Sequence, residues 1–324
     1  MRIDDISYNF KVAKVLSILM VTLYHYVDVE ELELVLWIPT AFALFIFAFS
    51  SGFFTSIKYQ YPFSLKKFWS AKVGRLLFPI IIIDIFLFLL FLLQRRADIF
   101  TWQTLPSLVG LNGFFGWFNN VQNPSPFGAG LWFFTLLFLF YFFYPLLSLL
   151  NKKQSSGTVF LLIILLSTTL LQELNPASPL FWMTQFAFIL GAYTGVHRHD
   201  ISPTVCVILF AVSCLLMLFL NTVLDISSLN YTLVLIAALT IIGFLLNARL
   251  PVFILGKLLI LSGCLVQIYF IHPYLYVSSI AGHPVINYVI SLFIIILVAL
   301  ILSKMTTLLR TFITEIKSPI PTGR

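Results

Sequence analysis

Long apolar stretches separated by short polar segments make up most of this chain. A transmembrane helix needs about 20 mostly apolar residues, and the hydropathy pattern predicts ten such stretches. They cover residues 10–27, 36–56, 75–93, 131–150, 158–173, 180–196, 203–221, 231–247, 257–276 and 285–303. We therefore predict an all-α fold, a polytopic membrane bundle of about ten transmembrane helices that forms a single integral-membrane domain over residues 1–324.

The polar segments between these stretches divide the positive charges unequally. If the N-terminus is cytoplasmic, all but two of the 19 Lys and Arg residues fall on the cytoplasmic side, and the two exceptions are Arg95 and Arg96. Cytoplasmic segments of membrane proteins carry such an excess. We expect both termini in the cytoplasm, a basic inner loop at about 57–75, a cytoplasmic tail at about 304–324 and a long outer loop at about 94–130.

The composition supports a multi-pass membrane protein, and we expect it in the cytoplasmic membrane. The chain is 60% hydrophobic and 10% charged, whereas a soluble domain carries about 25% charged residues. The net charge of +7 follows from the orientation in the membrane and does not indicate a nucleic-acid partner. The three cysteines lie in apolar runs without metal-ligand or disulfide spacing, and we expect no bound metal.

Two ionisable residues of the first predicted helix are candidates for chemistry. Lys14 and His25 are 11 residues apart, which places them within about 20° of one another around a helix and about 16 Å apart along its axis. A histidine titrates near neutral pH and suits a general base. The spacing also fits a structural histidine bonded to a neighbouring helix, and the sequence leaves both readings open.

A second cluster is basic. Lys67, Lys72 and Arg75 belong to the segment 57–75, which also contains Lys58 and Lys66. Several cations close together can bind phosphate groups. The same residues are also explained by cytoplasmic topology alone.

Two further ionisable side chains lie inside predicted spans. Asp84 needs a partner at membrane depth, because a charge there is costly. His25 and Lys14 are candidates for that partner, and Asp84 serves either structure or catalysis. His272 precedes a proline near the outer end of the ninth span. We expect His197 and His199, in a short inner loop, to be solvated.

Five short motifs, taken in chain order, resemble the acyltransferase 3 family of membrane acyltransferases. Each motif is weak alone, but together they cover most of the chain. The matching segments are Asp4/Asp5 with Lys14 and His25, then Ser51-Gly52-Phe53, Lys72-Val73-Gly74-Arg75 with Pro79, Leu131-Trp132-Phe133 with Tyr144-Pro145, and Tyr269-Phe270-Ile271-His272-Pro273. Lysine stands at Lys14 and Lys72 where the family commonly has arginine. Lysine keeps the charge and loses the bidentate geometry.

The resemblance implies an O-acyltransferase that moves an acyl group, usually acetyl, from cytoplasmic acyl-CoA to a hydroxyl of an extracytoplasmic or lipid-linked polysaccharide. Acetyl-CoA is then a co-substrate, and no cofactor is permanently bound. We expect the bare membrane module, without an appended extracytoplasmic domain.

The resemblance also implies roles for individual residues. His25 is the expected general base, Ser51 a donor to the thioester oxygen and Asp84 an orienting carboxylate. The expected CoA-binding residues are Lys14, Lys67, Lys72 and Arg75. Trp132, Tyr269 and His272 are expected to line the acceptor side.

Other functional classes remain open at this stage. A transporter or flippase of a lipid-linked sugar also explains many helices, many aromatic residues and a long outer loop. A structural partner in polysaccharide assembly and a homo-oligomer are open as well. The sequence does not identify the acceptor sugar or the acyl group.

Overall fold

The computed structural model describes residues 1–27, 33–111, 113, 125–128, 132–174, 179–198, 200–224, 229–278 and 283–317. The described residues form helices and no strands. Eight of their helices are long and apolar enough to cross a membrane, or nine if one bent pair of helices is a single span. The predicted all-α membrane bundle is therefore confirmed in its class. The count of ten and the cytoplasmic location of the termini stay predictions.

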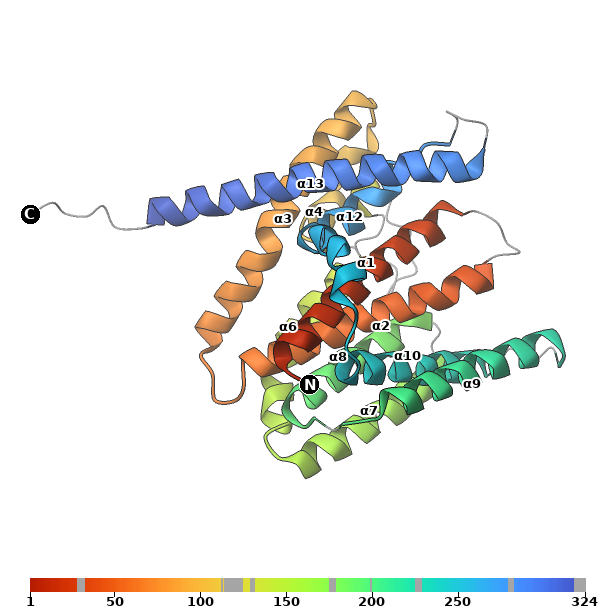
Figure 1. The fold of residues 1–324 in the computed structure, drawn as a ribbon. Helices are drawn as coiled ribbons and strands as arrows, with labels where there is room; N and C mark the ends of the chain where they lie inside the picture. The colour runs from red at the N-terminus through yellow and green to blue at the C-terminus, as the bar shows by residue number, and fades with distance from the viewer. Residues whose placement is uncertain are drawn as a thin grey trace, which may run out of the picture. The chain divides into compact units, whose positions relative to one another are not determined.

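The chain divides into two compact units, each built from two separate segments. One unit contains Met1–Phe63 and Leu136–Ser262, and the other contains Ser64–Thr135 and Gly263–Arg324. We refer to them as unit 1 and unit 2. Figure 1 labels the elements of both units.

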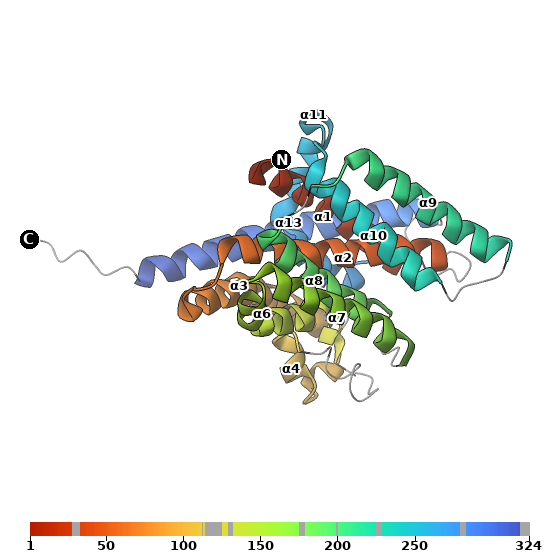
Figure 2. The same cartoon turned by 90° about the horizontal axis from the view of Figure 1, so that it is seen from below.

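Unit 1 is a bundle of long helices. In chain order its elements are α1 (Ile3–Tyr26), α2 (Glu33–Lys58), most of α6 (Trp132–Leu150), α7 (Gln154–Leu174), α8 (Pro179–Val196), α9 (Pro203–Thr222), α10 (Asn230–Asn247), α11 (Val252–Leu255) and most of the 3-10 segment η4 (Gly256–Gly263). Helix α2 packs against α1, α8 and α10, and α9 lies beside α10 (Figures 1 and 2).

Close contact between the backbones of α2 and α8 depends on small residues. A Cβ atom added at Gly52 would lie 2.1 Å from the carbonyl oxygen of Phe188, and one added at Gly191 would lie 2.1 Å from the carbonyl oxygen of Phe49. Such approach is common where small residues line membrane helices. The Gly191-x-x-x-Gly195 spacing, which predicts close helix packing, has this role.

The C-terminal end of α10 is capped by side chains from elsewhere in unit 1. The last carbonyl groups of a helix have no partners within it. The buried Asn9 donates from Nδ2 to the carbonyls of Leu245 (2.8 Å) and Ala248 (2.7 Å). Arg198 donates to the carbonyl of Leu246 at 3.1 Å, where its positive charge also complements the helix dipole.

Substituting Asn9→Leu should therefore destabilise unit 1. Two carbonyl groups would lose their donor in a buried site, and we expect the free energy of unfolding to fall by about 2 kcal/mol. Thermal unfolding of the detergent-purified protein measures the loss. Thr222→Val, which removes an exposed bond within α9, is the control, and an equal effect of both changes would contradict this role of Asn9.

One solvation prediction for unit 1 is wrong. His197 is not simply solvated, because its Nε2 lies 2.7 Å from the carbonyl oxygen of Asn151, just after α6. Its ring also lies 5.1 Å from that of Tyr193. The sequence places His197 in a short loop but does not show that the loop reaches the end of α6. His199, for which solvation is also predicted, lies outside the described residues.

Unit 2 is built around two long helices. Its elements are α3 (Leu65–Leu93), η2 (Asp98–Phe100), α4 (Thr104–Leu108), η3 (Pro126–Gly128), the first residues of α6, then α12 (Leu265–Ile271), η5 (His272–Tyr274) and α13 (Pro284–Lys317). Helices α3, α12 and α13 pack against one another.

Both long helices of unit 2 extend beyond the predicted spans. Helix α3 begins at Leu65 and α13 ends at Lys317, so most of the predicted basic loop and tail is helical. Ser64 caps α3 by accepting from the backbone N–H of Lys67, and lysine is a good helix former. A hydropathy pattern locates the apolar part of a helix, and it does not show whether the helix continues into a polar segment.

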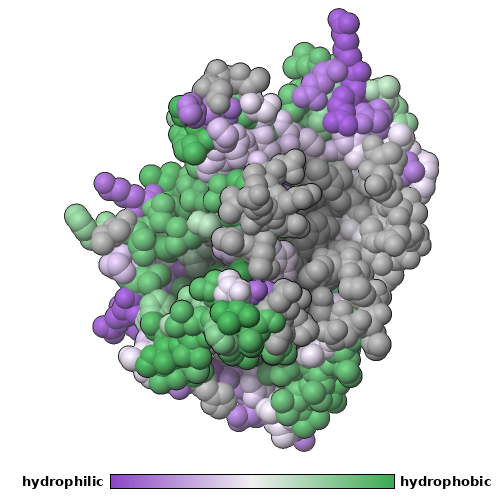
Figure 3. Space-filling model, turned by 90° about the vertical axis from the view of Figure 1, so that its right-hand side faces the viewer, coloured by the Kyte–Doolittle hydropathy of each residue, from purple (hydrophilic) through white to green (hydrophobic). Residues whose placement is uncertain are grey.

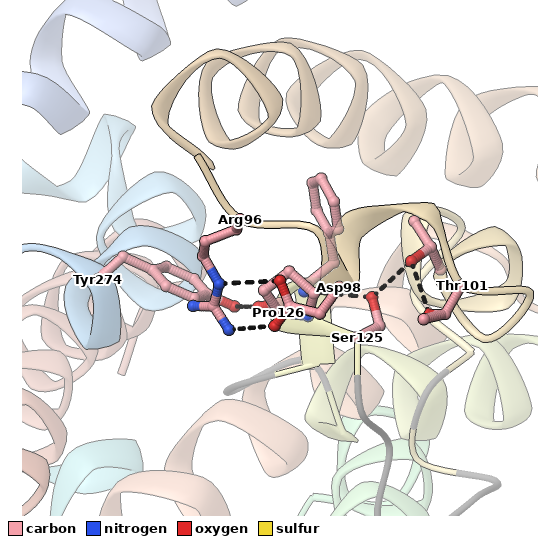
Figure 4. Close-up of polar contacts among 8 residues, drawn as sticks. Arg96, Asp98, Thr101, Ser125, Pro126 and Tyr274 are labelled. Carbon is pink, nitrogen blue, oxygen red and sulfur yellow. Dashed lines mark hydrogen bonds and ion pairs between the residues drawn. The ribbon is translucent and has the colours of Figure 1, made fainter. Parts of the chain in front are cut away.

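Part of the predicted outer loop folds into a small cap. Arg96 donates to Asp98 from Nε at 3.1 Å, and its guanidinium lies 5.3 Å from the centroid of the Phe91 ring. The hydroxyl of Tyr274 donates to the carbonyl of Pro126 (Figure 4). The Arg96 side chain holds the pKa of the Asp98 carboxyl below its usual range, so the ion pair persists until the pH falls below the ordinary aspartate pKa.

Apolar side chains are exposed along several helices, as a lipid-facing surface requires. On α7, for example, Leu166 is 65% exposed and Leu170 is 62% exposed. Figure 3 shows broad hydrophobic areas on one face of the molecule, with hydrophilic residues between them.

Candidate active site

The predicted stripe of α1 is present in the structure. An uninterrupted helix from Ile3 to Tyr26 carries both Lys14 and His25. Lys14 is half-buried, whereas His25 is exposed and is the last residue but one of the helix. The two residues therefore keep their common face and their separation of about 16 Å. His25 lies at the end of α1 opposite to the N-terminus rather than in the middle of the helix.

Packing between α1 and α2 shows where Ser51 lies along the axis of α1. The ring of Phe10 lies 5.7 Å from that of Phe49 and 6.1 Å from that of Phe53. Ser51 falls between these two contacts and so lies at the level of Phe10, one turn from Lys14. His25 is 15 residues beyond Phe10, which is about 22 Å along the helix axis.

Ser51 has a partner that the sequence does not suggest. Its Oγ lies 2.8 Å from the hydroxyl of Tyr141 on α6. Both residues belong to unit 1, so this hydroxyl pair is a defined feature near the level of Lys14. Tyr141 lies in a run of aromatic residues, where nothing in the sequence separates it from its neighbours.

Among the basic residues of α3, burial separates Lys72 from the others. Lys72 is 7% exposed, whereas Lys67 and Arg75 are exposed. The Nζ atom of Lys72 lies 5.7 Å from the centroid of the Phe68 ring, close enough for a cation–π contact. Lys72 is therefore the basic residue of this segment whose side chain is held inside the protein.

Arg310 of α13 is a neighbour of this basic cluster that sequence reasoning assigns only to the tail. Its guanidinium lies 5.6 Å from the centroid of the Phe78 ring. Phe78 is three residues from Arg75 on α3, so Arg310 and Arg75 are within about one helical turn in depth. Its place could only be found once α13 was known to continue as a helix along α3.

Asp84 is half-buried within α3. No group of its own unit, in the part of the chain that the structure describes, forms a hydrogen bond or ion pair with it. The predicted partnership with His25 or Lys14 stays a prediction, since those residues belong to the other unit.

His272 is fully buried, and nearby backbone carbonyl groups determine which of its ring nitrogens carries the hydrogen. Pro273 has no N–H, so the carbonyl of Tyr269 lacks its usual helical donor. The Nδ1 atom of His272 lies 2.7 Å from that carbonyl oxygen and 3.2 Å from that of Ile268. A carbonyl only accepts, so Nδ1 carries the hydrogen, and in the neutral ring Nε2 is an acceptor.

Of the two other residues predicted for the acceptor side, the structure describes the side chain of Tyr269 but not that of Trp132. The ring of Tyr269 lies 6.0 Å from that of His272 and 6.0 Å from that of Phe133, so Tyr269 and His272 are neighbours. Trp132 begins α6, and its side chain lies outside the described residues.

Comparison with known proteins defines the class. A family model for an acyltransferase domain, that of the acyltransferase 3 family, matches residues 7–304. The chain belongs to the acyltransferase 3 family. The match extends from the residues of α1 before Phe10 to the part of α13 that includes Lys304, and it includes residues of both units.

Family membership and the apolar helices together make this protein a membrane acyltransferase. No curated protein and no solved structure matches the chain. The roles of individual residues in this acyltransferase must therefore be argued from their chemistry and their places in the fold.

Proposed function

We propose that this acyltransferase moves an acetyl group from cytoplasmic acetyl-CoA to a hydroxyl of an extracytoplasmic or lipid-linked polysaccharide. Given the family, one structural observation is the main support for this proposal. A single helix holds a cation and an imidazole on one face, about 16 Å apart. A polar acyl donor that contacts Lys14 can extend along this helix toward His25. With the N-terminus in the cytoplasm, His25 lies near the outer side.

His25 is the proposed general base. Its imidazole accepts the proton of the sugar hydroxyl as the hydroxyl oxygen attacks the thioester carbonyl carbon. The carbon–oxygen bond of the ester forms, the carbon–sulfur bond breaks, and the proton passes to the departing sulfur. The products are an acetylated sugar and CoA with a free thiol, so all atoms are accounted for. A second route, with an acetyl group carried briefly on His25, uses the same residue.

The basic residues of α3 and α13 are the proposed phosphate site. Lys72 supplies a buried charge, and Lys67, Arg75 and Arg310 supply exposed ones. Arginine adds bidentate hydrogen bonds to phosphate oxygens. The N-terminal end of α3, with its positive dipole, also favours an anion nearby.

Ser51 and the acceptor-side residues take different places in this proposal. Because Ser51 lies about 22 Å from the level of His25 along α1, we place the Ser51–Tyr141 hydroxyl pair at the level of Lys14, away from the reacting carbonyl. Tyr269, His272 and Trp132 are proposed to bind the sugar. The Nε2 acceptor of His272 suits a sugar hydroxyl, and aromatic rings suit its apolar face.

Release of CoA tests the proposed reaction directly. The purified protein is incubated with acetyl-CoA, with or without surface polysaccharide from its host, and the free thiol is measured over time. We expect thiol release that depends on both substrates and on the protein. If the protein binds or moves the glycan without releasing thiol, the transporter reading replaces this proposal.

A further inference from the structure

Among the described residues of unit 2, one buried amide has an oxygen without a hydrogen-bond partner. Gln267 on α12 is 3% exposed, and its side-chain oxygen forms no hydrogen bond within the described structure. Burying an amide without a partner costs free energy, and such groups in folded proteins are uncommon and often indicate an absent ligand or water.

An aromatic contact relates the position of Gln267 to positions along α3. The rings of Phe91 and Tyr274 lie 5.3 Å apart. Each residue is near the C-terminal end of its segment, and each contacts the same turn: Phe91 packs on Phe127 at 5.1 Å, and Tyr274 donates to the carbonyl of Pro126. The C-terminal ends of the two segments therefore meet at the cap shown in Figure 4, and α12 packs against α3.

Seven residues before this contact, each segment carries a polar side chain. Asp84 precedes Phe91 by seven residues, and Gln267 precedes Tyr274 by seven. On α3, seven residues are about 20° short of two helical turns, so Asp84 shares a face with Phe91 and lies about 11 Å further from the cap. The other segment ends in the 3-10 helix η5, so Gln267 and Tyr274 are about 40° apart around the axis and about 12 Å apart along it. Asp84 and Gln267 thus occupy matching positions on packed segments.

Asp84 adds a second polar group: it is half-buried, and no group of its own unit within the described residues bonds to it. Buried Ile80 and Leu87 flank it on its helix face. A carboxyl at membrane depth without a partner is costly and indicates function. Together, Asp84 and Gln267 offer acceptors and one amide donor in otherwise apolar surroundings.

We propose that Asp84 and Gln267 bind the amide-linked pantetheine arm of acyl-CoA. This inference rests on the proposed acyl-CoA donor. Each secondary amide of the arm carries one N–H donor and one carbonyl acceptor, and the side-chain amide of Gln267 complements both. Asp84 accepts from an amide N–H. An arm with two amides cannot enter an apolar interior without such partners.

The position of Lys72 agrees with this assignment. It is buried on the same helix, 12 residues before Asp84, which is about 18 Å along the axis. A donor whose phosphates contact Lys72 would place its arm, and not its nucleotide, near Asp84 and Gln267. The nucleotide and the arm then have separate binding residues within unit 2.

Calorimetric binding to the full-length purified protein separates these two parts. The probes are CoA and the phosphorylated ADP that forms its nucleotide half and lacks the arm. For Gln267→Met, which conserves volume, we expect the Kd for CoA to rise about tenfold, equivalent to about 1.4 kcal/mol, and the Kd for the nucleotide half to stay unchanged. For Lys72→Ala we expect both Kd values to rise.

Two further variants keep the test decisive. Asp84→Asn, which retains one acceptor oxygen, should weaken CoA binding less than Asp84→Leu. Ser213→Ala, which removes a part-buried bond within α9 of unit 1, should change neither Kd. Binding is compared only among variants whose thermal unfolding matches that of the wild-type protein.

The outcomes distinguish this inference from the proposed function. If Gln267→Met changes neither Kd, or changes both equally, the pair is structural and the inference is overturned. A result in which the wild-type protein binds neither probe would remove the acyl-CoA donor itself and, with it, both proposals.

Discussion

Replacing His25 with alanine should reduce acetyl transfer by a factor of about 100 to 10,000, the usual contribution of a general base. The amount of folded protein should stay unchanged, because the His25 side chain is exposed at the end of α1. The rate of CoA thiol release per purified molecule, with acetyl-CoA and glycan at saturation, measures the effect.

The control for this change is His283→Ala. His283 is also exposed and directly precedes α13, and it has no role in the proposed reaction. Its loss should leave the rate within about twofold, since exposed substitutions are generally close to neutral. Equal rates for wild type and His25→Ala would remove His25 from the mechanism.

A single added methyl group at Gly191 should destabilise the protein severely. The new Cβ would lie 2.1 Å from the carbonyl oxygen of Phe49 and 3.0 Å from the backbone nitrogen of Phe53. These are backbone atoms, so α2 and α8 must separate to relieve the overlap. Overpacking costs up to about 3 kcal/mol and occasionally more, and we expect Gly191→Ala to reach this upper end in thermal unfolding of the purified protein.

Gly74→Ala provides a matched control within a helix. Its added Cβ would meet only the Phe78 side chain at 3.8 Å, an ordinary contact. Because alanine is a better helix former than glycine by about 1 kcal/mol, this change should be neutral or stabilising. If Gly191→Ala proved as mild as Gly74→Ala, the close approach of α2 and α8 would be contradicted.

The sequence predicted the positions of the helices well for a simple physical reason. A membrane span must be continuously apolar, so its centre is visible in hydropathy alone. The ends are less visible. The basic residues Lys66 to Arg75 look like a loop, yet they belong to α3 because Ser64 caps the helix before them.

The ninth predicted span shows a different limit. Hydropathy gives one stretch at 257–276, whereas the structure has η4 followed by α12 and η5. Glycine at Gly256 and Gly263 weakens the α-helix there, and an average over apolar residues does not record that effect.

The candidate site was partly accessible from the sequence. Lys14 and His25 were found because their spacing is a property of one helix. Gln267 and Tyr141 were missed because their importance comes from what faces them on other helices. The difference between buried Lys72 and exposed Arg75 likewise arises from packing, and not from residue type.

The most direct test of the central claim is the mass of the host's surface polysaccharide, compared between cells with the intact gene and cells carrying His25→Ala. The proposed function predicts that the repeat unit loses the mass of an acetyl group in the variant, while the amount of polysaccharide at the surface stays the same. An unchanged repeat mass together with less surface polysaccharide would contradict acetyl transfer and favour transport of the glycan.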